Sequence, residues 1–309
     1  MRALVTGGAG FIGSTLVDRL LAEGHAVDVV DDLSKGRLVN LADARADRSA
    51  ELKIHQVDIR SPEMAELVAR REPEVVYHLA AAFDRDPAAD AVVNIVGSLY
   101  VLEGARMAGS RKVVFAAGAS VYGEPDPDVM PVRESHPHKP VSAHGVAKKV
   151  VVDYLQLYRE RHDLEFTALA LATVYGPRQA STGGVVGAFA EALLHGLPVV
   201  VRGDGSQTRD FVYVDDVVDA FVRAADRGAG LLINVGRGVQ TSVRHVLATM
   251  AEAAGVDDVS PQTGERGPGD VDRMALDPSR AKIHLGWEPW TSLEQGIAQV
   301  LQAKAARPA

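Results

Sequence analysis

The chain has 309 residues, of which 47% are hydrophobic, so it can bury a sizeable core in one large domain or in a domain with a smaller lobe. Its 33 basic and 41 acidic residues give a formal charge of −8, which argues against a surface that tracks nucleic-acid phosphates. The absence of cysteine excludes a disulfide framework, a thiolate metal site and a thiol nucleophile.

Short apolar runs alternate with amphipathic stretches through the first half of the chain. Uninterrupted β-rich runs suit strands that are buried on both faces, and the interleaved helices suit right-handed crossovers. The pattern therefore predicts an α/β fold with a doubly wound parallel sheet. Strands are predicted at Ala3–Thr6, Ala26–Val30, Leu52–Val57, Val75–Leu79, Lys112–Ala116 and Thr167–Ala172. Helices are predicted over 14–23, 62–70, 88–108 and 142–161.

The pattern changes after about residue 173, where glycine-bounded segments include helices near 185–195 and 215–226. No stretch has the composition of a flexible interdomain linker, so the second half is expected to pack directly against the first. The predicted organisation is a Rossmann domain over 1–173, to which some later segments return, and a smaller α/β substrate lobe over 174–309.

The N-terminus has a very short apolar run that glycine interrupts, unlike the longer apolar stretch of a signal peptide. No later apolar stretch is expected to approach the roughly 18 to 20 residues that span a bilayer. The sequence therefore predicts a cytoplasmic protein with no membrane partner.

A glycine-rich turn follows the first predicted strand. Gly7, Gly10 and Gly13 permit a tight turn, close approach of the backbone to a pyrophosphate and close helix-to-strand contact. Phe11 and Ile12 complete the turn at the start of the helix. Three glycines also occur in ordinary loops, but their place between a strand and a helix favours a dinucleotide site.

Acidic residues end the next two predicted strands. A carboxylate at Asp31 or Asp32 accepts both hydroxyls of the adenosine ribose and repels a 2′-phosphate, which favours NAD over NADP. Lys35 and Arg37 lie close enough to keep NADP as the less favoured cofactor. Asp58 either binds adenine or serves as a cap or turn residue.

Ordered motifs continue along nearly the whole chain. They are His78-Leu79-Ala80-Ala81, Asn94, Val121-Tyr122-Gly123, Val174-Tyr175-Gly176-Pro177-Arg178, Arg209-Asp210-Phe211-Val212-Tyr213-Val214-Asp215-Asp216 and Leu285-Gly286-Trp287. With the spacing of the glycines, they resemble the extended short-chain dehydrogenase/reductase family, specifically its nucleotide-sugar epimerases of the UDP-glucose 4-epimerase type. This resemblance implies NAD as cofactor, a UDP-sugar as substrate and a homodimer formed by 88–108 and 142–161, although apolar faces there would also cover the sheet. The resemblance also implies further contacts with the cofactor, at Ser34, Gly36, Ile59, Leu79, Ala80, Ala81, Asn94 and Lys148.

The catalytic centre departs from the family. Such enzymes pass a hydride from C4 of the sugar to NAD and back, while a base removes and returns the 4-hydroxyl proton. The base is normally the tyrosine of a Tyr-x-x-x-Lys pair, whose lysine holds the nicotinamide ribose, with a Ser or Thr nearby. This chain keeps Lys148, but it has His144 in place of the tyrosine and Gly118 in place of the hydroxyl residue.

Two interpretations of this centre remain open. In the first, neutral His144 is the base, because histidine titrates near neutral pH and Lys148 disfavours the protonated ring; Ser120 or a water replaces the missing hydroxyl. In the second, His144 is a polar wall in a protein that binds a nucleotide sugar but turns it over slowly or not at all. The prediction is a UDP-sugar 4-epimerase with His144, Lys148 and Ser120 as catalytic residues. A keto-sugar reductase of the same scaffold is a further alternative.

The substrate lobe follows the family more closely. Arg209 matches the arginine that grips the diphosphate, and Arg266 and Asp270 lie near the family's ribose and phosphate clamp. The Pro268-Gly269 insertion leaves the register of Arg266 open. Further predicted contacts are Thr173, where the family usually has asparagine, and Val185, Val186, Val200 and Arg202.

The predicted valine contacts have an alternative interpretation. Packing in the apolar core would explain these valines equally well. The segment from Ala82 to Pro87 is shorter than in close relatives, which leaves the sugar open. No metal site is predicted, because His136 and His138 lack a third ligand of suitable spacing.

Overall fold

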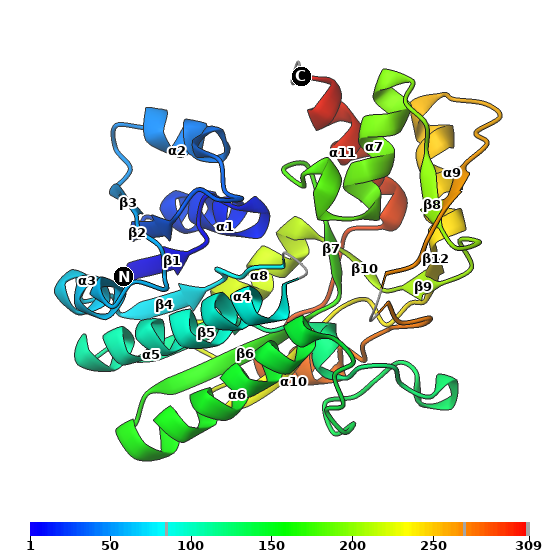
Figure 1. Ribbon diagram of the computed structural model, residues 1–309. Coiled ribbons are helices and arrows are strands. Elements are labelled where there is room, and N and C mark those ends of the chain that lie inside the picture. Colours follow the sequence, from blue (N-terminus) through cyan, green and yellow to red (C-terminus); the bar gives the residue numbers. More distant parts are fainter. Residues whose placement is uncertain (84–85, 268–269, 307–309) are drawn as a thin grey trace.

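The computed structural model describes residues 1–83, 86–267 and 270–306, and it combines a large helix-covered sheet with a smaller lobe (Figure 1). Seven parallel strands form the sheet in the order β11-β6-β5-β4-β1-β2-β3. The strand order reverses between β1 and β4, so the predicted doubly wound fold is confirmed. The strands are β1 Arg2–Thr6, β2 Ala26–Asp31, β3 Leu52–Gln56, β4 Val75–His78, β5 Lys112–Ala116, β6 Glu165–Leu171 and β11 Leu231–Val235.

Helices cover both faces of the sheet, and each face has its own apolar core. α3, α5 and α6 pack together on one face, while α1, α2 and α8 pack on the other. β11 and α8 come from the second half of the sequence, so later segments complete the first domain. The helices are α1 Phe11–Ala22, α2 Ala42–Ala46, α3 Glu63–Arg71, α5 Ser98–Met107, α6 Ala143–His162 and α8 Val214–Ala224.

The smaller lobe packs three helices against one another beside short strand pairs, β7 with β10, β9 with β12 and β8 with β13. Only Ala172 separates β6 from β7, which is why no flexible linker joins the two parts. The lobe's strands are β7 Thr173–Tyr175, β8 Val200–Arg202, β9 Thr208–Arg209, β10 Phe211–Tyr213, β12 Thr241–Ser242 and β13 Gln262–Gly264. Its helices are α7 Val185–His195, α9 Val243–Ala254 and α11 Leu293–Ala305, and α10 Ser279–Leu285 packs on α8 and β11.

The helix expected over 88–108 runs from Pro87 to Met107 in three segments: α4 (Pro87–Ala91), a π-helical turn η2 (Val92–Gly97) and α5. Its 21 residues and mean hydropathy of 1.3 suffice in length and composition to cross a membrane, which corrects the expectation that no stretch approaches that length. α5 instead packs against α3 and α6. The apolar character of the helix is therefore used, at least in part, inside the protein.

Candidate active site

The glycine-rich turn between β1 and α1 is packed so closely that its glycines are required. A Cβ at Gly13 would lie 2.1 Å from the Gly7 carbonyl oxygen, and a Cβ at Gly7, whose φ is +69°, would lie 2.8 Å from the Ala80 nitrogen. α1 begins at Phe11, and the residue at its N-cap is Gly10, which has no side chain to cap the helix. The first N–H groups of this helix are left for an anion, so the turn fits a pyrophosphate.

A cleft of about 250 Å³ opens beside this turn, along the carboxyl ends of β1 to β4. Arg60, Ala82 and Asp90 line it and are absent from the prediction. It brings together most of the predicted cofactor residues, namely Gly7, Gly10, Asp31, Asp32, Ser34, Gly36, Asp58, Ile59, Leu79, Ala80 and Ala81.

Asp31, the last residue of β2, and Asp32, which follows it, differ in environment. Asp31 is 7% exposed and accepts hydrogen bonds from the N–H groups of Ala9 and Leu33, both at 2.9 Å. Burial raises the pKa of Asp31. Asp32 is exposed and accepts from the backbone and hydroxyl of Ser34. Asp31 therefore ties the glycine-rich turn to β2, whereas Asp32 closes a local turn.

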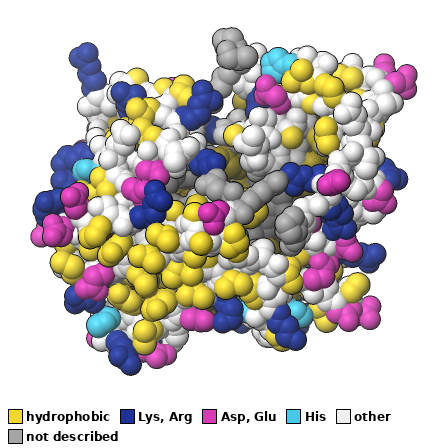
Figure 2. Space-filling view, viewed as in Figure 1, with side chains coloured by type: hydrophobic (Ala, Val, Ile, Leu, Met, Phe, Trp, Pro, Cys, Tyr) yellow, Lys and Arg dark blue, Asp and Glu magenta, His cyan; other side chains and the backbone are white. Residues whose placement is uncertain are grey.

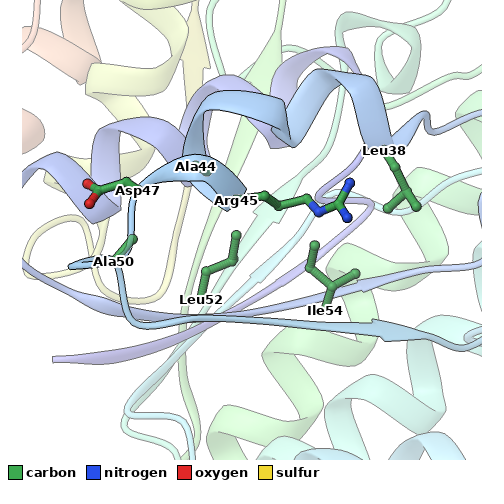
Figure 3. Close-up of a pocket in the computed structure, with 7 residues that line it drawn as sticks. All are labelled: Leu38, Ala44, Arg45, Asp47, Ala50, Leu52 and Ile54. Atoms are coloured by element: carbon green, nitrogen blue, oxygen red, sulfur yellow. The ribbon is translucent and has the colours of Figure 1, made fainter.

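Another hollow lies at the edge strand β3, under α2 (Figure 3). Figure 3 shows the Arg45 side chain extended above Leu52 and Ile54, toward Leu38. Neither the glycine-rich turn nor α6 contributes to it, so we assign the chemistry to the cleft. The part of the chain that the structure describes also contains no group of three or more His, Asp or Glu side chains that could hold a metal ion.

The structure brings Ser120 and α6 together after the end of β5. Ser142 caps α6 by accepting from the N–H of Gly145 at 3.1 Å, which starts the helix just before His144. A Cβ at Gly145 would lie 2.4 Å from the Ser120 carbonyl oxygen, so glycine allows the first turn of α6 to lie against Ser120. Lys148 follows one turn later on the same face.

Burial governs the charge of both titratable groups in this centre. Lys148 donates to the Ala116 carbonyl at 2.7 Å and lies 4.6 Å from the centroid of the Phe115 ring; desolvation lowers its pKa to about 7. Desolvation, and next the charge of Lys148, lower the pKa of His144 to about 4. The imidazole is therefore neutral at pH 7. Its Nδ1 is buried and has no hydrogen-bond partner among the described residues.

Ser120 has the features of a replacement hydroxyl. Its Oγ is buried and likewise lacks a hydrogen-bond partner within the described ranges. A Cβ built on Gly118 would lie 3.5 Å from this oxygen, in ordinary van der Waals contact. The Ser120 hydroxyl thus lies next to the space that a side chain at 118 would enter.

In the smaller lobe, two of the predicted side chains, Arg266 and Asp270, lie near Arg209 on β9. Burial lowers the pKa of Arg209, Asp270 opposes this shift, and Arg266 adds to it, so the three groups lie within electrostatic reach of one another. Arg266 pairs with Asp272 and donates to the Asp270 carbonyl at 3.3 Å. Arg202 lies on β8, from which the turn leads toward β9.

The remaining predicted contacts occupy different environments. Val186 is 1% exposed and belongs to the core, which matches the packing alternative. Val185 begins α7 and is partly buried, whereas Val200 on β8 is 51% exposed. Thr173 begins β7, and its N–H donates to the Asp210 carbonyl at 2.8 Å. Pro268 and Gly269 lie outside the described residues.

Residues 3–236 match the model of the NAD dependent epimerase/dehydratase family. The chain belongs to this family. It is 47% identical to the UDP-glucose 4-epimerase of Mycolicibacterium smegmatis over 98% of both chains. Among solved structures it is similar to the UDP-glucose 4-epimerase of Thermotoga maritima with UDP-glucose, at 39% identity and a TM-score of 0.92. It also resembles that of Thermus thermophilus in complex with NAD, at 36% identity and a TM-score of 0.90, and both likenesses cover 98% of each chain.

Within this epimerase/dehydratase family, NAD is the cofactor, and the glycine-rich turn and the Asp31 side of the cleft fit it. Sequence reasoning missed two neighbours of His144. The Phe83 ring meets its imidazole edge-to-face at 5.4 Å between centroids, and the Ala82 backbone forms a hydrogen bond with it. No side-chain motif signals a backbone contact of this kind. The contracted segment they begin includes Asp84 and Arg85, which lie outside the described residues.

Proposed function

We propose that this member of the family is a UDP-sugar 4-epimerase in which His144 and Ser120 replace two of the usual catalytic residues beside the retained Lys148. One observation carries the proposal. Nδ1 of His144 and Oγ of Ser120 are both buried, and neither has a partner in the described structure. Buried polar atoms are normally paired, so this centre is suited to a ligand that offers hydroxyl groups.

When bound, NAD supplies the acceptor for a hydride from C4 of the sugar and returns that hydride to the opposite face. The chain's own residues move the proton. Neutral His144 takes the proton of the 4-hydroxyl during oxidation and gives it back during reduction, so the overall reaction is an isomerisation. Ser120 donates a hydrogen bond to the same oxygen, and the charge of Lys148 discourages His144 from holding a proton at rest.

We propose that Arg209, Arg266 and Arg202 bind the diphosphate of the substrate. Planar guanidinium groups suit a diphosphate, and the partial burial of Arg209 strengthens its attraction for an anion. The named relatives act on UDP-glucose, and UDP-glucose is present in the Thermotoga maritima structure. A UDP-sugar is therefore the substrate class that we propose, with the identity of the sugar left to the assay.

The test is an NMR time course of the protein with NAD and, in turn, UDP-glucose, UDP-galactose, their N-acetyl forms and UDP-glucuronic acid. Conversion of any one into its C4 epimer supports the proposal. His144→Phe should lose at least about 100-fold in kcat, since a general base contributes that much or more, while it still binds NAD. If no sugar changes although NAD and UDP both bind, the epimerase proposal fails.

One observation favours a second candidate, a nucleotide-sugar-binding protein with weak turnover. A pKa of about 4 makes His144 a poor acceptor for an alcohol proton, because efficient bases have a pKa near the working pH. A keto-sugar reductase would use the same scaffold for a single hydride transfer. Supplying NADH and a 4-keto sugar nucleotide separates the reductase from the binder, because only the reductase consumes NADH.

We also propose a homodimer, located in the cytoplasm, that is formed through α4, η2, α5 and α6. Figure 2 shows hydrophobic side chains gathered on this face of the protein. Val92, Val96 and Val146 are each more than 40% exposed, and Leu157 is 37% exposed. An apolar patch of this kind marks an association surface. Light scattering of the purified protein should give twice the chain mass, and Val96→Asp with Val146→Asp should give the monomer.

A further inference from the structure

Asn94 holds the backbone of Ala82 by two hydrogen bonds. Its Oδ1 accepts from the Ala82 N–H, and its Nδ2 donates to the Ala82 carbonyl, both at 2.8 Å. Asn94 itself is 2% exposed. A side-chain amide that pairs with both groups of one residue fixes that residue's peptide planes in the way a neighbouring strand would.

The other side of Asn94 is anchored in the sheet. Ser98 donates to the Asn94 carbonyl at 2.7 Å and contacts Nε2 of His78 at 2.8 Å, and Nδ1 of His78 lies 2.7 Å from the Thr6 hydroxyl. Thr6 in turn accepts from the Ala80 N–H at 3.2 Å. Asn94 lies in the π-helical turn η2, a distortion that is common at functional sites. The segment that follows β4 is thus held at both Ala80 and Ala82.

Ala82 and Phe83 are the neighbours that orient His144. The Phe83 ring stands at 88° to the imidazole. The hydrogen bond with the Ala82 backbone raises the pKa of His144, so it stabilises the protonated ring and its acceptor is the Ala82 carbonyl. A carbonyl can only accept, so the ring nitrogen that faces it carries the hydrogen. The other nitrogen keeps its lone pair, which is what a base requires.

We propose that Asn94 is a positioning residue that acts through Ala82 and Phe83 to fix the tautomer and orientation of His144. This rests on the proposed role of His144 as the base. It differs from the role predicted from sequence, in which Asn94 contacts the cofactor directly. Both polar atoms of the Asn94 amide already bond to Ala82.

The first test reads the tautomer of His144 directly. The ring nitrogens of ¹⁵N-histidine-labelled protein are recorded by long-range ¹H–¹⁵N NMR, and His144→Phe identifies the His144 signals. The wild type should show one tautomer, whereas Asn94→Asp, which loses the donor to Ala82, should show a mixture. Asn234→Asp is the matched control, because Asn234 is also fully buried and donates to a backbone carbonyl. An unchanged His144 tautomer in folded Asn94→Asp would overturn the proposal.

The second test separates positioning from cofactor binding. Asn94→Asp and Asn94→Ser should lower kcat by about tenfold or more while the Kd for NAD changes less than about threefold. A parallel loss of NAD affinity would make Asn94 a cofactor ligand and overturn the proposal. If the wild type does not turn over any sugar, the proposed function fails but the NMR test still decides this one. If one variant does not fold, the other carries the same measurement.

Discussion

The glycine-rich turn and the His144 centre lie at the same edge of the sheet, and they differ in what fixes their geometry. Backbone approach fixes the turn, where a Cβ on Gly13 would overlap the Gly7 carbonyl oxygen. Side chains define the other centre, where Gly118 has room for a side chain and Ser120 and His144 have unpaired polar atoms among the described residues. A backbone-defined site cannot vary without losing the fold, whereas a side-chain-defined site can exchange one hydroxyl or base for another.

The largest expected effect comes from breaking the backbone-defined site. Gly13→Ala must move either the turn or α1, which should lower the free energy of unfolding by about 3 kcal/mol and the affinity for NAD by at least ~100-fold. Gly183→Ala is the matched control, because the φ of Gly183 is not positive and a Cβ there would lie no closer than 3.4 Å to the described atoms around it. Thermal unfolding and NAD titration of both variants check this. Equal losses at the two positions would contradict the close-approach argument.

The second effect concerns the acid side of the activity profile. A base must be unprotonated, so wild-type kcat/KM should be flat down to about pH 5, halve near pH 4 and then fall about tenfold per pH unit. His144→Tyr should move this limb several units upward, since a phenol ordinarily titrates near pH 10. Epimerisation rates from pH 3.5 to 9 check both profiles, with activity regained at pH 7 excluding unfolding. Identical profiles would show that residue 144 is not the base.

The same difference between backbone-defined and side-chain-defined geometry explains which parts of the site could be predicted from the sequence. The glycine-rich turn was predictable because the spacing of the glycines reflects backbone geometry, and the end of the second strand placed Asp31 and Asp32 beside the turn without distinguishing between them. The departure at His144 was equally visible. Its surroundings were not, because the Ala82 contact uses backbone atoms and the buried Ser98-His78-Thr6 hydrogen bonds join residues far apart in sequence. The expectation that no apolar stretch approaches the length of a membrane span was wrong for Pro87–Met107, whose α5 segment packs against α3 and α6.

A third experiment sharpens the contrast between Asp31, which ends β2, and Asp32, which follows it. Asp31→Asn removes a charge that we expect to bind the adenosine ribose and alters the acceptor of the Ala9 N–H in the glycine-rich turn, so NAD affinity should fall by ~10-fold or more and the preference over NADP should shrink. Asp32→Asn should change NAD affinity less than ~3-fold, because Asp32 is exposed and bonds to Ser34. Calorimetric titration with both cofactors compares them. A larger loss in Asp32→Asn would transfer the ribose contact to that residue.

The smallest effect tests the exchange of hydroxyls in the side-chain-defined centre. Ser120→Ala should lower kcat by about tenfold, the scale of one lost hydrogen bond to a reacting oxygen. Gly118→Ser should fold normally, because its Cβ meets only the Ser120 hydroxyl among described atoms, at 3.5 Å. Alone it should change kcat less than ~3-fold, since Ser120 already provides the hydroxyl, and in the Ser120→Ala background it should restore most of the loss. If Ser120→Ala is silent while Gly118→Ser raises kcat strongly, the centre lacks the family's hydroxyl and Ser120 does not replace it.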